Sequence, residues 1–229
     1  KPDIAVIEAV AITEDGGIIP TTSVGNSASF AIFAEKVIVE INTNTSTAFE
    51  GLHDIYIPTY RPTRQPIPLT KVDERMGSTA INIDPAKIVG IVFNDTLLDS
   101  PSTVTPPDDE TQGIANHLIA FFEKEVAEGR LPKNLGPLQA GIGSIANAVL
   151  TGLKDSPFED LVMYSEVLQD CTFELIDAGK MKFASGCSIT LSQKYGEKVF
   201  GNIEAYRDKL VLRTQEMSNH PELVRRLGI

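Results

Sequence analysis

Short apolar runs divide the first hundred residues of the chain. They are rich in β-branched residues and bounded by turn-forming residues, a pattern typical of strands buried in a sheet. The runs cover residues 4–12, 36–41 and 88–93. Asp15-Gly16-Gly17 follows the first run and predicts a tight turn, because glycine adopts the positive φ that such turns require. Residues 43–80 contain no clear element, and a loop of that length is usually functional or packed over something.

The apolar pattern changes after residue 107 to an alternation of helices and strands. Residues 108–128 predict the clearest helix, since large apolar residues recur at three- and four-residue spacing from Ile114 to Val126. Strands are then predicted at 135–140, 160–168, 181–185, 189–191 and 209–213, and helices at 142–153, 170–179, 196–206 and 221–227. Strands that alternate with helices pair in parallel, so the pattern predicts an α/β fold with a mixed or mostly parallel sheet.

A segment rich in proline, serine and threonine, Asp99–Asp108, separates the two patterns. Such a composition is typical of linkers between domains. We therefore place a domain boundary within it, with residues 1–104 in one α/β domain and residues 105–229 in the next.

The charge of the chain argues against two classes of partner. With 229 residues and a net charge of −11, it is not expected to bind nucleic acid or an anionic membrane surface. An acidic chain can still hold a phosphorylated ligand, because glycine-turn amides and helix N-termini bind phosphate without net positive charge. No apolar run reaches the length of a membrane span. We expect a cytoplasmic protein, or a mitochondrial one if the source is a eukaryote.

Residue types that ligate metals are few and scattered. His53, His117 and His220 lie far apart, and the two cysteines have no metal-ligand spacing, so no metal site is expected. Two thiols in a chain of this size favour a reducing compartment over a disulfide scaffold. Cys171 could be read as a nucleophile, but no partnered histidine lies nearby in the sequence. A small buried residue is therefore the favoured interpretation of Cys171.

A glycine motif carries the most specific chemistry in the sequence. Gly141-Ile142-Gly143-Ser144-Ile145-Ala146 fits the pattern G-x-G-x-x-G/A between a predicted strand and a predicted helix, and Glu166 follows the next strand. In a dinucleotide-binding fold such a turn holds the pyrophosphate and such an acid holds the ribose. The alternative is a tight turn in a generic α/β domain, with Glu166 a solvated acid. The motif alone gives the two interpretations similar weight.

Longer stretches of the sequence resemble one known family. Two of them surround the glycine motif and the acid: Ala140-Gly141-Ile142-Gly143 and Tyr164-Ser165-Glu166-Val167-Leu168-Gln169-Asp170. The others cover residues 51–56, 71–78, 129–135, 217–222 and 225–228. Together they resemble, in register along the chain, the acetyl-CoA hydrolase/transferase family of class I coenzyme A (CoA) transferases.

The resemblance implies a different role for the acid. It implies that Glu166 is a nucleophile that attacks an acyl-CoA thioester and then carries CoA as a glutamyl-CoA thioester. It also implies that the Ile142 amide contributes to an oxyanion hole and that Asn219 lies close to the reacting thioester. The residues implied to line CoA are Leu138, Gln139, Ala140, Gly141, Ile142 and Gly143. The implied substrates are acetyl-CoA or succinyl-CoA and a short carboxylate, with hydrolysis as a side activity and no permanently bound cofactor.

The resemblance further implies the architecture. CoA-transferases of this class have three-layer α/β domains with a mixed or parallel sheet. Residues 1–104 would be the C-terminal part of the first domain, and residues 105–229 the N-terminal part of the second, which carries Glu166. Family members are longer, with acyl-pocket residues before Lys1 and further CoA contacts after Ile229, and we expect a homodimer.

Two functions without acyl transfer stay open. In the first, the chain is a nucleotide- or dinucleotide-binding module that uses Gly141-Ile142-Gly143 and Glu166. In the second, it is a non-catalytic sensor of a sugar phosphate or another effector, because one α/β scaffold can host such sites as well.

Overall fold

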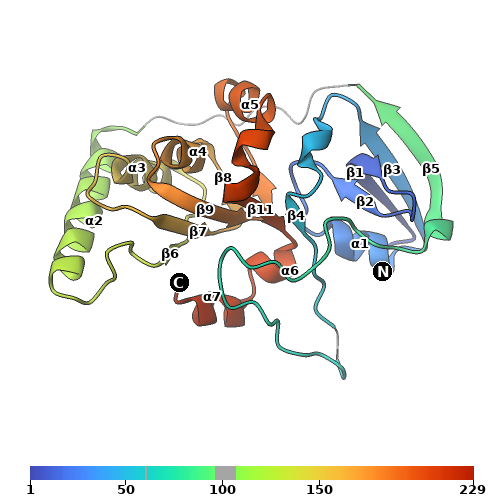
Figure 1. The fold of residues 1–229 in the computed structure, drawn as a ribbon, viewed down its shortest axis with the longest axis horizontal. Helices are drawn as coiled ribbons and strands as arrows, with labels where there is room; N and C mark the ends of the chain where they lie inside the picture. The colour runs from blue at the N-terminus through green and yellow to red at the C-terminus, as the bar shows by residue number, and fades with distance from the viewer. Residues whose placement is uncertain (60, 96–106) are drawn as a thin grey trace.

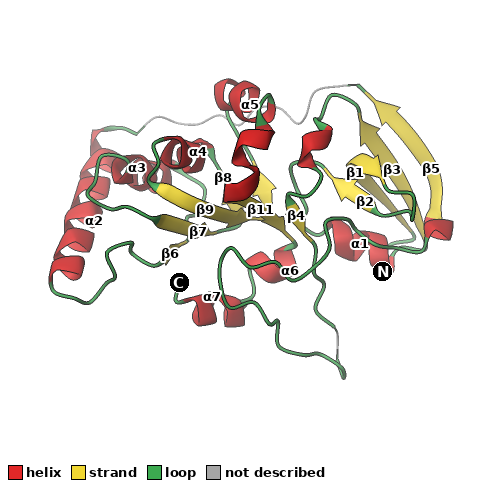
Figure 2. Ribbon diagram, in the orientation of Figure 1, coloured by secondary structure: helices red, strands yellow, loops and turns green. Residues whose placement is uncertain are grey.

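The computed structural model describes residues 1–59, 61–95 and 107–229. Their strands form a four-stranded sheet, a five-stranded sheet and a two-stranded pair, with helices packed beside them (Figure 1, Figure 2). All but the last two residues of the predicted linker Asp99–Asp108 lie outside the described residues. The division at residues 104 and 105 therefore stays a prediction.

The four-stranded sheet is built from the first half of the chain. Its order is β2-β1-β3-β5, with bounds Ile18–Pro20, Ile4–Ile12, Lys36–Asn42 and Ile88–Asn94. The three long strands were predicted from the sequence and pair in parallel, while β2 runs antiparallel to β1. The predicted turn is confirmed, since Gly16 has a φ of 82°. It leads into β2, which the sequence did not predict.

One face of this sheet is apolar and exposed. Along β1, Ala5, Ile7 and Ala9 are buried toward α1 (Ser27–Phe33), whereas Val6 on the opposite face is 62% exposed. Phe93 of the edge strand β5 is 74% exposed although it pairs in register with Ile41, which lies on the same face as Ala9. The alternation from Ile4 to Ala9 is what a strand packed on one face only produces.

The five-stranded sheet is parallel throughout, as the alternating pattern predicted. Its order is β4-β11-β9-β7-β6, with bounds His53–Asp54, Leu210–Arg213, Met181–Gly186, Leu161–Tyr164 and Pro137–Leu138. The strand β4 lies between β3 and β5 in the chain, so the chain leaves the four-stranded sheet after β3, adds an edge strand to the second sheet, and returns to form β5.

Both faces of the five-stranded sheet are covered, which gives the predicted three-layer α/β arrangement. Leu161 and Met163 of β7 belong to the main core, which includes residues of α3 (Ser144–Leu153) and α4 (Asp170–Asp177). Tyr164 faces the other way, into a second cluster with residues of α6 (Gln215–Ser218), α7 (Pro221–Leu227) and the 67–76 loop. Burial on both faces is usual for a parallel sheet.

The predicted helix over 108–128 is confirmed as α2 (Asp109–Ala127), which packs on α3. Its start is a capping box. The Asp108 carboxylate accepts from the Thr111 amide at 2.9 Å, and the Thr111 hydroxyl accepts from the Asp108 amide at 2.9 Å. These bonds satisfy amides that the first helical turn leaves without partners. In the part of the chain that the structure describes, no helix is both long and apolar enough to cross a membrane.

Two predictions of elements were wrong in detail. The helix expected over 196–206 is α5 (Gln193–Phe200) followed by a 3-10 turn, Ile203–Lys209, because the Ser192 hydroxyl caps a helix that begins earlier. The single strand expected over 160–168 breaks after Tyr164. The chain then enters β8 (Val167–Leu168), which pairs with β10 (Ser188–Ile189) outside the large sheet. Two further 3-10 turns cover Thr47–Phe49 and Pro85–Lys87.

Candidate active site

Glu166 lies at the point where the chain leaves the five-stranded sheet. It stands in the two-residue break between β7 and β8, and its side chain is half-buried. Its main-chain carbonyl accepts two hydrogen bonds, from the amide of Cys187 at 2.7 Å and from the amide of Ser188 at 3.2 Å. The connection between β9 and β10 therefore fixes the backbone from which the carboxylate projects.

The carboxylate of Glu166 is held by an amide from α6. Gln215 Nε2 donates to Glu166 Oε1 at 3.0 Å. The oxygen of the same amide accepts from Asn26 Nδ2 at 3.0 Å, and the main-chain amide of Gln215 donates to the Gly25 carbonyl at 3.0 Å. Because a glutamine side chain ends in one acceptor and one donor group, the bond to Asn26 turns the NH₂ group toward Glu166.

The glycine motif forms the turn between β6 and α3. Gly143 has a φ of 143°, which residues with a Cβ rarely adopt, and it stands immediately before the first residue of α3. A Cβ placed on Gly141 would meet no described atom within 4 Å, so the turn exposes its backbone beside open space. Open backbone amides of this kind can bind an anion or an oxyanion closely.

Ser165 joins this turn to the acid. Its hydroxyl donates to the Ala140 carbonyl at 2.9 Å and accepts from the Ala140 amide at 3.3 Å. Ser165 is fully buried and is the residue directly before Glu166. The glycine turn and the carboxylate, 25 residues apart in the sequence, are therefore placed relative to one another by one side chain.

All six residues implied to line CoA surround one hollow of about 540 Å³. We call it the glycine-turn hollow, and it is lined by Leu138, Gln139, Ala140, Gly141, Ile142 and Gly143 together with the first residues of α3 and the α2 residues Leu118 and Phe122. The Ile142 side chain is 73% exposed at its rim. The structure brings these residues together, while their binding of CoA stays a prediction.

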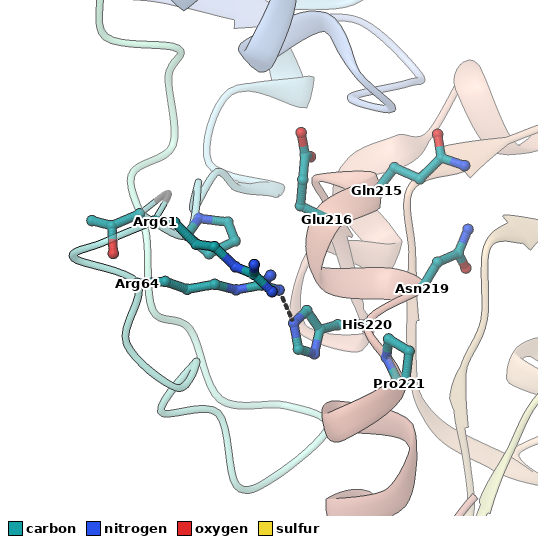
Figure 3. A pocket seen from close by; sticks show the side chains of 9 residues that line it. Arg61, Arg64, Gln215, Glu216, Asn219, His220 and Pro221 are labelled. Carbon is teal, nitrogen blue, oxygen red and sulfur yellow. Dashed lines mark hydrogen bonds between the residues drawn. The ribbon is translucent and has the colours of Figure 1, made fainter.

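Asn219 lies at a second hollow, of about 620 Å³, between the 58–64 loop and the α6–α7 segment. We call it the arginine cleft, and it is lined by Pro58, Thr59, Arg61, Arg64, Gln215, Glu216, Asn219, His220 and Pro221 (Figure 3). Asn219 follows Gln215 by one turn of α6, and both side chains leave the helix on the same side (Figure 3). Gln215 therefore connects this cleft with Glu166.

The neighbouring thiol is kept protonated. Cys187 is buried, and its burial, together with the charges of Glu166 and Glu216, raises the pKa of its thiol to about 11. Burial likewise raises the pKa of Cys171 to about 12, which agrees with the interpretation of Cys171 as a small buried residue. Neither thiol is a nucleophile at neutral pH, because the thiolate is the reactive form.

A buried ion pair between Arg213 and Asp54 lies in the five-stranded sheet. The Arg213 guanidinium, fully buried, binds the Asp54 carboxylate, the Ser185 hydroxyl at 2.8 Å and the Val72 carbonyl at 2.9 Å. The other oxygen of Asp54 accepts from the amides of Met76 and Gly77 at 2.9 and 2.6 Å. The stretches 51–56 and 71–78, which carried part of the family resemblance, thus meet around one charge pair.

Comparison with known proteins finds sequence similarity to acetyl-CoA hydrolases and CoA-transferases. Residues 1–93 match the model of the acetyl-CoA hydrolase/transferase N-terminal domain. An acetyl-CoA hydrolase from Schizosaccharomyces pombe is 50% identical over 99% of this chain, and a succinyl-CoA:acetate CoA-transferase from Clostridium kluyveri is 47% identical over 100% of it. The chain is thus similar to members of the acetyl-CoA hydrolase/transferase family along nearly its whole length. It spans 43% and 42% of the length of these two members.

Solved structures agree on the fold of this chain. A 4-hydroxybutyrate CoA-transferase from Porphyromonas gingivalis aligns with 97% of the chain and 47% of its own length, with a TM-score of 0.64 and 19% sequence identity. At that identity the likeness establishes the shared fold alone.

The sequence did not predict three residues of the candidate site. They are Gln215, Asn26 and Ser165, which position Glu166 or its neighbouring turn. Gln215 and Asn26 are 189 residues apart and belong to no motif, so no local pattern connects them. Ser165 stands beside the acid and could have been suspected from that place alone. Among the described residues, no cluster of three or more His, Cys, Asp or Glu side chains could hold a metal ion.

Proposed function

We propose that this chain supplies the nucleophile of an enzyme that transfers CoA between an acyl-CoA and a short carboxylate. Acetyl-CoA or succinyl-CoA would be the donor. The two relatives named above are an acetyl-CoA hydrolase and a succinyl-CoA:acetate CoA-transferase, and both names fit this proposal. In this proposal hydrolysis arises when water, instead of a carboxylate, attacks the same covalent intermediate.

The reaction proceeds in balanced steps on the Glu166 carboxylate. The carboxylate attacks the thioester carbonyl, the C–S bond breaks, and a mixed anhydride and CoA thiolate result. The thiolate then attacks the glutamyl carbon, which releases the first acid as a free carboxylate and leaves a glutamyl-CoA thioester. A second carboxylate attacks this thioester and reverses both steps. Covalent catalysis of this kind divides one difficult transfer into easier ones.

Each step passes through a tetrahedral oxyanion that needs donors aimed at it. The glycine turn supports this role, because the Ile142 amide belongs to the segment that Ser165 ties to the acid. Asn219 supplies a side-chain amide on the same side of α6 as Gln215, which binds Glu166. We assign the Ile142 amide to oxyanion stabilisation and Asn219 to the thioester side of the site.

The observation that carries the proposal is the set of hydrogen bonds that holds Glu166 in position. Its backbone is bonded to two amides, its carboxylate to Gln215, and its neighbour Ser165 to the glycine turn. A nucleophile must be held in position while its reactive oxygen stays accessible. The second oxygen of the half-buried carboxylate has no hydrogen-bond donor among the described residues and is the one we assign to attack.

Trapping the covalent intermediate tests the proposal. The full-length polypeptide is incubated with acetyl-CoA and then with borohydride, which reduces a glutamyl thioester to a primary alcohol, and the peptide containing residue 166 is analysed by mass spectrometry. We expect reduction at Glu166, and a fall in transfer rate of about 10⁴-fold or more in Glu166→Ala. Glu197→Gln, which removes an exposed acid of α5, serves as the matched control.

An unmodified Glu166 in a protein that still transfers CoA would reject the mechanism. The nucleotide-binding alternative is separated by titration with NAD and with CoA, since binding of NAD without CoA would favour it. A protein that binds a phosphorylated ligand and exchanges no CoA with carboxylates would favour the sensor. A homodimer, a cytoplasmic or mitochondrial location and the absence of a bound cofactor stay predictions.

A further inference from the structure

Two arginines on the 58–64 loop lack acidic partners. Arg61 and Arg64 extend across the arginine cleft toward His220 (Figure 3). Within residues 1–59, 61–95 and 107–229, neither guanidinium lies within ion-pair distance of a carboxylate, whereas four other arginines do. Those four are Arg130, Arg207, Arg213 and Arg226. Arg75 and Arg225 also have no ion pair among the described residues, but Arg75 donates to the carbonyls of Gly51 and His53 and Arg225 is exposed on α7. Arg61 and Arg64 differ from these two because they line a cleft together.

His220 supports Arg64 without neutralising it. Arg64 Nη2 donates to His220 Nε2 at 2.8 Å, so this ring nitrogen is an acceptor and carries no proton. Burial and the charge of Arg64 lower the pKa of His220, which keeps the ring neutral at neutral pH. A carboxylate in the same place would cancel the charge of the guanidinium. A neutral imidazole orients one edge of the Arg64 guanidinium. It leaves the positive charge and the other N–H groups of that guanidinium available to a ligand.

The cleft also reaches the proposed nucleophile. Gln215 lines it, and the same side chain binds Glu166. At about 620 Å³, its volume is in the range of small-molecule sites. A ligand in this cleft therefore lies one side chain away from the reacting carboxylate.

We propose that Arg61 and Arg64 bind an oxyanion carried by a substrate at the end remote from the reacting carbonyl. The inference rests on the proposed function only for the identity of that substrate. Planar guanidinium groups match the geometry of carboxylate and phosphate oxygens. Two substrate groups offer this chemistry: the second carboxylate of a dicarboxylic acid, such as succinate, and a phosphate of CoA.

Binding measurements on the full-length polypeptide separate these sources. The first pair of probes is succinate and butyrate, which have the same number of carbons and differ by one carboxylate. The second pair is CoA and dephospho-CoA, which differ by the 3′-phosphate. Each probe is titrated calorimetrically into the wild type, the double variant Arg61→Gln/Arg64→Gln, and the control Arg225→Gln, which removes an exposed arginine of α7.

We expect the wild type and Arg225→Gln to prefer the more anionic member of one pair. The double variant should lose that preference through a weakening of about tenfold to a hundredfold for the anionic probe alone. Loss of the succinate preference assigns the site to a distal carboxylate, and loss of the CoA preference assigns it to the 3′-phosphate. Arg64→Lys, which keeps the charge and removes the fork, should fall between the wild type and the double variant.

The proposal is overturned if the double variant, folded by circular dichroism, keeps every preference of the wild type, or if the wild type shows none. These outcomes do not depend on the fate of Glu166. A protein without a glutamyl-CoA intermediate that still discriminates the probes through Arg61 and Arg64 would reject the proposed function and keep the oxyanion site. A protein that forms the intermediate and ignores both arginines would do the reverse.

Discussion

The two large sheets are built from similar strands but are covered differently. The five-stranded sheet is buried on both faces, and Tyr164 on one of them bonds through its hydroxyl to the Met217 carbonyl of α6 at 2.7 Å. The four-stranded sheet leaves Val6 exposed on the face opposite α1, and its edge strand β5 leaves Phe93 exposed. The proposed nucleophile emerges from the doubly covered sheet, and the segment after β2 contributes supporting contacts to it through Gly25 and Asn26. The region with the better covered sheet thus carries the proposed chemistry.

Breaking the buried ion pair should have the largest effect on stability, because it removes the charge that compensates Arg213. Asp54→Asn leaves a guanidinium in the interior without its carboxylate, and we expect the free energy of unfolding to fall by about 3–5 kcal/mol. Urea denaturation measures this. The control is Glu159→Gln, which removes the exposed partner of Lys180 and should change the midpoint little. Equal effects of the two changes would show that the pair does not hold the five-stranded sheet together.

Acidification should weaken the same sheet through His53. Burial, assisted by the charge of Arg75, lowers the pKa of His53 to about 4, although its bond to the Thr21 carbonyl opposes the shift. Between pH 6.5 and about 4 the unfolded state therefore binds a proton that the folded state does not. Stability should be fully present above pH 6.5 and decline as the pH falls, by on the order of 3 kcal/mol in total.

Denaturation midpoints across this pH range measure the contribution of His53. His53→Gln keeps a donor for the Thr21 carbonyl and should flatten the pH dependence, whereas His117→Gln, which changes an exposed histidine of α2, should leave it as it is. An unchanged slope in His53→Gln would assign the acid sensitivity to other groups.

Removing the support of the acid should cost activity with little loss of stability. Gln215→Ala deletes the donor to Glu166, and we expect kcat to fall about tenfold to a hundredfold, as for a hydrogen bond to a charged group. Asn26→Ala frees the orientation of that amide and should cause a smaller fall. Steady-state kinetics with acetyl-CoA and a carboxylate measure both, with Gln193→Ala on the exposed start of α5 as the control. A rise in KM alone would indicate substrate binding instead of positioning.

Changing an exposed residue of the edge strand β5 should have the smallest effect. In the chain of residues 1–229, Phe93→Ser removes an apolar side chain that is 74% exposed, and we expect the free energy of unfolding to change by no more than about 0.5 kcal/mol. Leu161→Ala, in the core of the other sheet, should cost about 2–5 kcal/mol. Chemical denaturation compares them. A loss above about 1 kcal/mol for Phe93→Ser would mean that the edge strand β5 is covered at this residue.

Sequence periodicity predicted most of the elements because it reflects burial. The long strands, the parallel pairing and the α2 helix were predicted from apolar spacing and are confirmed. The strand over 160–168 was wrong because apolar residues stand on both sides of the break at Ser165 and Glu166, and Val167 and Leu168 pair with a different partner, β10. Periodicity reports that a residue is buried, but it does not report which strand buries it.

The site was predicted only as far as local sequence reaches. The glycine turn and Glu166 share one strand-turn-helix-strand unit, so their proximity follows from the pattern. Gln215, Asn26 and the two arginines come from separate segments, and only the tertiary fold brings them to one place. Nothing in the composition of a chain with net charge −11 indicates a cleft lined by two arginines.

The break between β7 and β8 has a mechanical consequence for a residue that would carry a molecule as large as CoA. The main chain at Glu166 is hydrogen-bonded to Cys187 and Ser188, and the side chain of its neighbour Ser165 is hydrogen-bonded to Ala140. These bonds hold the backbone at Glu166 in place. The Glu166 backbone would then stay in place between reaction steps, and a tethered CoA would move through rotation about the side-chain bonds of Glu166 and its own single bonds. In the proposed reaction, the incoming acid would therefore have to diffuse to a stationary attachment point.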